Sequence, residues 1–233
     1  MSRSTDVVSS TLASVLRFGA GLSARPAARR PDKLLELYDF EACPFCRRAR
    51  EALSKFDLDA MVYPCPRGGT RFRPRAIELS GKSSFPFLVD PNTGKSMLES
   101  ADIVTYLRET YGAPSDPVWL GPLGMLSSGL ASGVRASRGR RARPSRAPGR
   151  PLELWSYEGS PYSRLVRETL CELELPYVLH NVARGSAQRE AFVKRSGKMM
   201  VPYLVDPNTG REMFESGDIV AYLEQTYALG GAP

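Results

Sequence analysis

The sequence predicts an α/β protein made of two tandem units, each with the element order β-α-β-α-β-β-α. An internal repeat gives the first indication, because LLELYDFEACPFCRRARE at 34–51 matches PLELWSYEGSPYSRLVRE at 151–168. The hexapeptide VDPNTG gives the second, since it occurs at 89–94 and again at 205–210. Similar segments, MLESADIVTYLRETY and MFESGDIVAYLEQTY, follow the two hexapeptides. The chain therefore contains the same structural unit twice.

Each unit opens with a strand and a helix. A short apolar run at 34–38 or 152–156 predicts the first strand. Pro44 and Pro161 then stand in the first turn of a helix, where the missing N–H loses no hydrogen bond. In the first copy the apolar residues recur at helical spacing, at Ala49, Ala52, Leu53 and Phe56.

The middle of each unit alternates strand and helix. Segments 60–64 and 177–181 predict the second strand, and segments 72–81 and 188–197 predict a short helix. The stretch FPFLVDPNTGKSML at 85–98 then predicts two strands joined by a turn, for which Asn and Gly supply the backbone conformations.

An amphipathic helix ends each unit. Ser100 or Ser216 is expected to be its N-cap residue, because a serine side chain accepts a hydrogen bond from the free N–H groups of the first turn. The buried side of this helix in the first copy is expected to hold Ile103, Val104, Tyr106 and Leu107.

The repeat boundaries divide the chain into four parts. We expect a basic N-terminal arm at 1–33, a first domain at 34–112, an Arg-rich linker or arm at 113–150 and a second domain at 151–233. The N-terminal arm is Arg- and Ser-rich, as organellar transit peptides are. However, its SSTLASVLR resembles SSGLASGVR in the second arm, so we expect both arms to belong to the structural unit, as short helices on a neighbouring domain.

The charge of the chain is concentrated in the arms. The net charge is +7, while residues 135–150 hold seven Arg and no acid and residues 1–30 hold five Arg and one Asp, which leaves −4 for the rest. A basic arm can bind a phosphate backbone or an anionic membrane. A solvated linker is the favoured interpretation, because no aromatic residues alternate with the arginines for base stacking, and no specific nucleic-acid partner is expected. No apolar run is long enough to cross a bilayer.

Cys43 and Cys46 form a CPFC motif at a predicted helix start. A cysteine at this place faces free N–H groups and the positive end of the helix dipole, which favour its thiolate. Cys46 lies one turn further on, within reach of a disulfide with Cys43. We therefore expect Cys43 to be a nucleophile and Cys46 a resolving thiol; the alternatives are two buried thiols or half of a zinc site. Cys65, Cys171 and His180 show no metal spacing, so no metal is expected.

With this order of elements, and with CPFC after the first strand of the first copy, each copy resembles a thioredoxin-fold domain of the glutaredoxin and glutathione S-transferase N-terminal type. The resemblance covers 34–112 and 151–228. It implies cis peptide bonds at Phe85-Pro86 and Val201-Pro202, whose backbone pairs with a cysteinyl unit. It also implies that the Glu-Ser pairs that open the last helices bind the γ-glutamyl end of glutathione. These pairs are Glu99 with Ser100 and Glu215 with Ser216.

The second copy carries Ser160 at the position of Cys43 and cannot form a disulfide there. The function expected is glutathione-linked disulfide reduction by the first copy, with glutathione and disulfide-containing substrates as partners and the second copy a thiol-free glutathione-binding or structural domain. In some transferase classes a serine here activates the glutathione thiolate, so a transferase acting through Ser160 is the alternative. We expect no all-helical transferase domain after either copy, which would count against conjugation. A non-catalytic interaction module is the third hypothesis.

A CxxC motif without a secretory signal indicates a reducing compartment, such as cytoplasm or plastid stroma, and not secretion.

Overall fold

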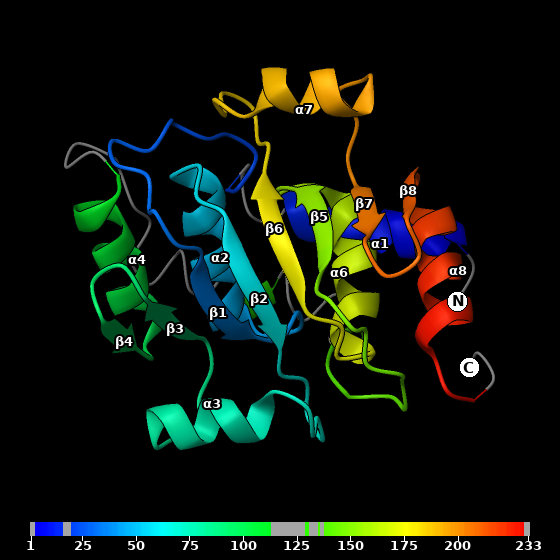
Figure 1. Ribbon diagram of the computed structural model, residues 1–233, viewed down its shortest axis with the longest axis horizontal. Helices are drawn as coiled ribbons and strands as arrows, with labels where there is room; N and C mark the ends of the chain where they lie inside the picture. Colours follow the sequence, from blue (N-terminus) through cyan, green and yellow to red (C-terminus); the bar gives the residue numbers. More distant parts are fainter. Residues whose placement is uncertain (1–2, 16–19, 113–128, 131–134, 136–137, 231–233) are drawn as a thin grey trace.

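The computed structural model describes residues 3–15, 20–112, 129–130, 135 and 138–230, and Figure 1 shows their arrangement. All the strands of both repeats belong to one eight-stranded sheet. The strands are β1 (Leu35–Asp39), β2 (Ala60–Pro64), β3 (Phe87–Asp90), β4 (Lys95–Met97), β5 (Leu152–Ser156), β6 (Tyr177–Asn181), β7 (Tyr203–Asp206) and β8 (Arg211–Phe214).

The described helices follow the order expected for two copies of one unit, with one more helix at the N-terminus. They are α1 (Arg3–Val15), α2 (Pro44–Lys55), α3 (Arg73–Ser80), α4 (Ser100–Thr110), α6 (Pro161–Glu172), α7 (Arg189–Ser196) and α8 (Ser216–Tyr227). The predicted fold class is therefore confirmed: the strand and helix order β-α-β-α-β-β-α occurs twice.

The two repeats join through their central strands. The sheet order is β4-β3-β1-β2-β6-β5-β7-β8, and β2 pairs with β6 in antiparallel orientation. The middle pair of this ladder is Met61 with Val178, two positions that are 117 residues apart, as are equivalent residues in this part of the repeat. A pseudo-twofold axis therefore passes between Met61 and Val178, and it relates each element of one copy to the same element of the other.

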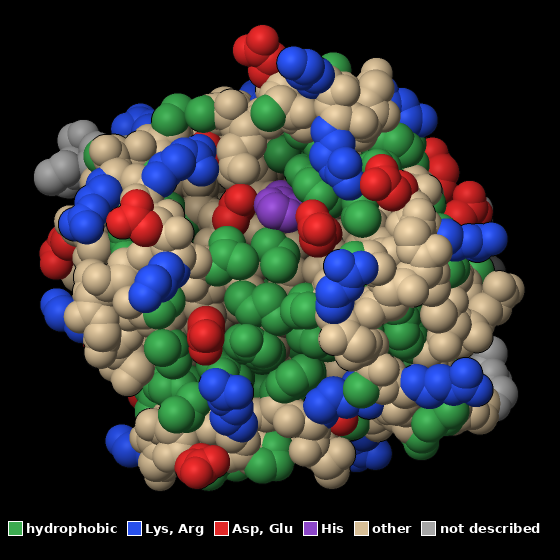
Figure 2. Space-filling model, in the orientation of Figure 1, with side chains coloured by type: hydrophobic (Ala, Val, Ile, Leu, Met, Phe, Trp, Pro, Cys, Tyr) green, Lys and Arg blue, Asp and Glu red, His purple; other side chains and the backbone are tan. Residues whose placement is uncertain are grey.

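Helices lie on both faces of the sheet (Figure 1). On one face α2 packs with α4 and α6 packs with α8, and their apolar side chains form one continuous core that spans both repeats. On the other face, α3 covers a smaller aromatic cluster in the first repeat and α7 covers another in the second repeat. Figure 2 shows this second face, where hydrophobic side chains gather over the central strands between the two helices.

The repeated VDPNTG hexapeptide has a structural role in each copy. The carboxylate of Asp206 accepts hydrogen bonds from the hydroxyls of Tyr222 and Tyr227, both at 2.6 Å, and from the backbone N–H of Asn208 at 2.8 Å. Asp90 makes the same set of bonds in the first copy. The motif therefore ties the β-hairpin to the last helix of each repeat.

The N-terminal arm contacts the second copy. Helix α1 packs against α6, and the Ser10 hydroxyl donates to the backbone oxygen of Pro161 at 2.7 Å. Most of segment 127–135, its counterpart in the other arm, lies outside the described residues. Arg135 at its end is buried between Glu168 and Asp6.

The rest of the second arm is part of the fold as well. Arg143 pairs with Glu172 at 3.2 Å and with Glu224. Several arginines of this arm therefore neutralise carboxylates of the second copy. Over the part of the chain that is described, no helix combines the length and apolar character needed to cross a bilayer.

Candidate functional site

The CPFC turn connects β1 to α2. Cys43 is the N-cap residue, with an extended backbone at φ −82° and ψ 122°, and its Sγ accepts the backbone N–H of Cys46 at 3.3 Å. Pro44 takes the first helical position, where it has no N–H to leave unpaired. The carbonyl oxygen of Phe85 lies 3.8 Å from the same sulfur. The fold thus surrounds one sulfur atom with a helix N-terminus and the segment before β3.

The pKa values of the two thiols in the motif are shifted in opposite directions. A hydrogen bond from the Cys46 side chain contributes most to lowering the pKa of Cys43, and it acts with the N–H groups of Cys46 and Phe45 and the charge of Arg50 against burial. Burial and the neighbouring Cys43 sulfur raise the pKa of Cys46 well above its usual value. This arrangement suits a nucleophilic thiolate beside a thiol that stays protonated until it is needed.

Both Phe85-Pro86 and Val201-Pro202 are cis peptide bonds. The Phe85 carbonyl contact brings the first of them to Cys43. In the second copy the corresponding turn begins with Ser160, the N-cap residue of α6. The two copies therefore share one backbone frame around different side chains.

The Glu-Ser pairs open the last helices but not as expected. Helices α4 and α8 begin at Ser100 and Ser216, and the N-cap residues are Glu99 and Glu215. The predicted serine N-caps are wrong by one position, because the residue with non-helical backbone is the glutamate, at φ −9° for Glu99 and +68° for Glu215. Both glutamates are exposed and both serines are buried. Among the described residues, no hydrogen bond connects these four side chains to Cys43 or Ser160.

Ser160 is buried, with 2% of its surface exposed. Its Oγ accepts the backbone N–H of Ser163 at 3.2 Å and the Ser163 hydroxyl at 2.9 Å. Helix α1 reaches this turn through the contact of Ser10 with Pro161. Ser160 and Ser163 thus reproduce the geometry of Cys43 and Cys46 with oxygen in place of sulfur.

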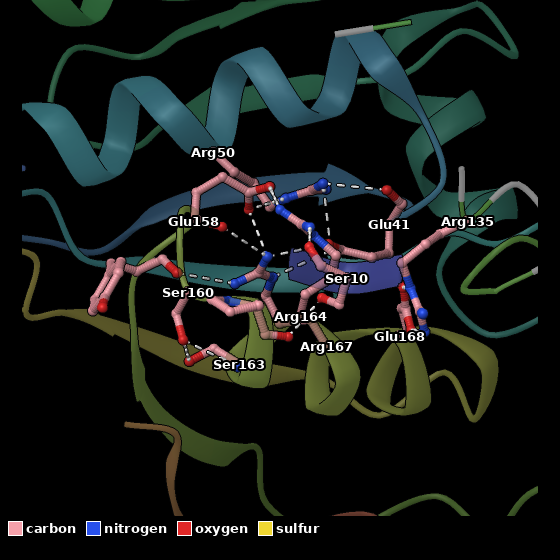
Figure 3. A network of polar contacts seen from close by, with 12 residues as sticks. Ser10, Glu41, Arg50, Arg135, Glu158, Ser160, Ser163, Arg164, Arg167 and Glu168 are labelled. Carbon is pink, nitrogen blue, oxygen red and sulfur yellow. Dashed lines mark hydrogen bonds and ion pairs between the residues drawn. The ribbon is translucent and has the colours of Figure 1, made fainter. Parts of the chain in front are cut away.

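Behind both turns lies a buried network of charged side chains that the sequence reasoning missed (Figure 3). Arg50 of α2 donates to Glu158 at 2.9 Å and also pairs with Asp39. Arg167 of α6 donates to Glu41 at 3.1 Å and forms an ion pair with Glu158 at 2.8 Å. These five side chains are all nearly inaccessible to solvent. The signal was present in the repeat, because Glu41, Arg47 and Arg50 recur as Glu158, Arg164 and Arg167.

The network holds ionised carboxylates in the protein interior. Burial alone would raise the pKa of Glu158, but the arginines around it, with Arg167 first, lower it to about 2. Burial raises the pKa of Asp39 to about 6, against the attraction of Arg50. The charge of Arg50 also contributes to lowering the pKa of Cys43.

The remaining candidates have structural surroundings. Cys65 and Cys171 are buried, and burial raises both thiol pKa values. His180 stacks on Trp155 with ring centroids 4.2 Å apart and lies between two carboxylates. Within the described ranges, His, Cys, Asp and Glu side chains form no group of three or more able to hold a metal ion.

The chain matches the family described as glutathione S-transferase, N-terminal domain, over residues 37–115 and 154–231. Because these two stretches cover more than half of the chain, it belongs to that family. It is therefore a glutathione-related protein with the thioredoxin fold, as the CPFC, proline and Glu-Ser motifs implied.

Two fungal proteins are similar to part of the chain. Glutathione S-transferase-like protein OpS6 of Beauveria bassiana is 32% identical over 81 residues, which are 35% of this chain and 37% of that protein. Glutathione S-transferase-like protein gedE of Aspergillus terreus is 31% identical over 77 residues, which are 33% and 34% of the two chains. The similarity thus spans about a third of the length of these curated relatives.

Two solved structures are also similar. The glutathione transferase BmGSTD1 of Bombyx mori shares 24% identity over 38% of this chain and 43% of its own, with a TM-score of 0.33. The trimeric glutathione transferase TDR1 of Leishmania shares 14% identity over 86% of this chain and 68% of its own, with a TM-score of 0.31.

Proposed function

We propose that the protein is a glutathione-linked thiol–disulfide oxidoreductase that uses Cys43 and Cys46. The observation that carries the proposal is the position of the Cys43 sulfur at the start of α2, where it accepts the N–H of Cys46 at 3.3 Å. Such a position stabilises a thiolate and lowers the barrier to attack on a disulfide. A reducing compartment suits this activity, since the dithiol must be regenerated by thiols.

The reaction exchanges sulfur–sulfur bonds. The Cys43 thiolate attacks one sulfur of a substrate disulfide, forms a mixed disulfide and releases the other sulfur as a thiolate, which takes up a proton. Cys46 then loses its proton and attacks the Cys43 sulfur, so that the second half of the substrate leaves and a Cys43–Cys46 disulfide remains. Two glutathione molecules reverse this change: the first forms a mixed disulfide at Cys43 and the second leaves with it as glutathione disulfide.

Glutathione would bind along the backbone before the cis prolines and at the last helix of each repeat. In this proposal the backbone of Phe85, next to Pro86, pairs with the cysteinyl unit of glutathione, and the start of α4 at Glu99 and Ser100 receives its γ-glutamyl end. The same groups in the second copy are Val201, Pro202, Glu215 and Ser216. That copy is then a thiol-free glutathione-binding or structural domain.

Intact-protein mass after mixing reduced protein with glutathione disulfide tests the proposal. Cys46→Ser should gain the mass of one glutathione, because the mixed disulfide at Cys43 has no resolving thiol. Cys43→Ser should gain none, since Cys46, Cys65 and Cys171 are buried and their thiol pKa values are raised. The wild type should lose two hydrogens as its internal disulfide forms. The proposal fails if Cys46→Ser and Cys43→Ser gain glutathione equally.

Glutathione conjugation at Ser160 is the second candidate. Ser160 Oγ accepts two hydrogen bonds from Ser163, which leaves its own proton free to bond a glutathione thiolate and favour its ionised form. Burial does not separate the two candidates, because Ser160 is 2% exposed and Cys43 is 5% exposed. Conjugation of an electrophile that survives in Cys43→Ser and is lost in Ser160→Ala would favour it.

A further inference from the structure

The two residues before Cys43 are held by the other half of the chain. Arg167 donates to both carboxylate oxygens of Glu41, at 3.1 and 3.3 Å (Figure 3). The backbone N–H of Ala42 points to the carbonyl oxygen of Gly139 at 3.5 Å. Arg167 belongs to the second repeat and Gly139 to the arm that precedes it. Two other parts of the chain, the second repeat and the arm before it, therefore contact the residues that precede Cys43.

Gly139 passes so close to the CPFC turn that a side chain does not fit. Its φ of +64° is favourable only for glycine, and a Cβ atom would stand 2.7 Å from the Cβ of Glu41. Its N–H donates to a carboxylate oxygen of Glu172 at 2.8 Å, which fixes the arm to α6. The backbone of the arm at Gly139 therefore packs directly against the Glu41 side chain.

The second copy is held by the first in the same way. Arg50 donates to Glu158 at 2.9 Å, and the N–H of Gly159 bonds to the carbonyl of Gly21 at 3.0 Å. Gly21 has a φ of +76°, and a Cβ there would stand 2.9 Å from the Cβ of Glu158. The contacts across the pseudo-twofold axis are therefore reciprocal.

The two copies differ in their chemistry and agree in these contacts. Ser160 and Ser163 stand at the positions of Cys43 and Cys46, so the second turn holds no sulfur. Arg167 contacts Glu41 of the first copy as well as Glu158 of its own copy. The second copy therefore contributes a side chain to the turn that carries the thiols.

We propose that the second repeat and the arm before it form the scaffold of the first site, in which Arg167 of the repeat and Gly139 of the arm are positioning residues that hold Glu41 and Ala42 and thereby keep Cys43 aligned with the N–H of Cys46. This inference rests on the proposed function, because it assigns a role at the same sulfur. Arg167 and Glu41 are both buried, and the bidentate contact between them fixes the direction of the Glu41 carboxylate as well as its distance. A shift of the turn would lengthen the 3.3 Å contact that stabilises the thiolate.

Gly139→Ala and Gly21→Ala form a matched pair for the test. Both introduce a methyl group at a positive φ against a buried glutamate, so a purely structural role predicts similar losses of thermal stability for both. The readout is the second-order rate of reaction with 4,4′-dithiodipyridine between pH 5 and 9 in the full-length protein. We expect Gly139→Ala to raise the apparent pKa of Cys43 by about half a unit or more, which is roughly a threefold loss of thiolate below that pKa. Gly21→Ala should leave the profile unchanged.

Arg167→Lys is the second variant, in case Gly139→Ala does not fold. Lysine keeps the positive charge and loses the two-point contact with Glu41, so it should shift the profile in the same direction. A wild-type profile in the folded Gly139→Ala or Arg167→Lys protein would overturn the inference and leave the proposed function standing. Equal shifts in Gly139→Ala and Gly21→Ala would also overturn it. An ordinary thiol profile for wild-type Cys43 would instead remove the proposed function, and the inference with it.

Discussion

Cys43→Ser is expected to lower the rate of glutathione-coupled disulfide reduction by roughly 10³-fold or more, to the uncatalysed background. The reason is chemical, because a serine hydroxyl cannot form the mixed disulfide through which the exchange proceeds. No other thiol can replace it, since burial raises the pKa values of Cys46, Cys65 and Cys171, whereas the hydrogen bond from Cys46 lowers the pKa of Cys43. The measurement is the consumption of a small disulfide at fixed glutathione, with glutathione reductase regenerating the thiol.

Ser160→Ala is the matched control for this loss, because Ser160 occupies the equivalent helix N-cap in the second copy. It should retain the wild-type rate within about twofold, apart from the modest stability lost with a cap. The reverse pattern, in which Ser160→Ala is inactive and Cys43→Ser is active, would assign the chemistry to the second copy and to conjugation.

Glu158→Ala is expected to destabilise the protein by about 3–5 kcal/mol, because removing one partner of a buried ion pair leaves the other charge without compensation. Glu158 accepts a hydrogen bond from Arg50 at 2.9 Å and forms an ion pair with Arg167 at 2.8 Å, and all three side chains are almost completely buried. Its loss would leave the two buried guanidinium groups with only Asp39 and Glu41 to balance their charge. Urea unfolding measures this change as a lower midpoint.

Glu109→Ala provides the comparison for an exposed ion pair. Glu109 contacts Arg108 at 3.1 Å with 63% of its side chain exposed, so its removal should cost less than about 1 kcal/mol. If Glu158→Ala were as mild as Glu109→Ala, the buried network would not hold the two repeats together.

The contribution of Glu158 also has a definite pH dependence. Its pKa is lowered to about 2 in the folded protein, below the value of an exposed glutamate. The stabilisation is therefore fully present above about pH 4.5 and is lost as the pH falls towards 2. Glu158→Ala should flatten this acid limb of the stability curve.

Much of the fold could be predicted because the same sequence pattern occurs in both repeats. The strands at 60–64 and 177–181 were predicted from short apolar runs, and the structure places β2 and β6 at the same residues. The VDPNTG turns follow from Asn and Gly in both copies. Helix α4 starts at Ser100, one residue earlier than a Ser100 N-cap implies, and its cap residue is Glu99.

The joint between the repeats could not be predicted from these patterns. β2 and β6 would be apolar whether they paired with each other or belonged to two separate sheets, so their sequences do not show that they pair across the two copies. The residues of α2 were harder still, because Arg47 and Arg50 are typical of a solvated helix face. They are buried since the second repeat covers that face, which is a tertiary effect with no local signal.

The thiols of the site were predicted from the sequence, but the residues that contact the turn around them were not. CPFC after a strand indicates a helix N-cap cysteine, and the structure has Cys43 in that position. The contacts of Arg167 and Gly139 with the turn join residues nearly a hundred or more positions apart in the chain. Only the symmetric recurrence of Glu41 and Arg50 in the second copy could have drawn attention to them.

The most direct measurement of the central claim is the rate at which iodoacetamide modifies each of the four cysteines as a function of pH, followed by peptide mass spectrometry. The thiolate is the reacting form, so a lowered pKa moves the rise in rate to lower pH. We expect Cys43 to reach its full rate below the pH at which an ordinary thiol does, and to react at least about tenfold faster at pH 7 than Cys46, Cys65 or Cys171. If Cys43 titrates like an ordinary thiol, or another cysteine reacts first, the first copy is not the redox site described above.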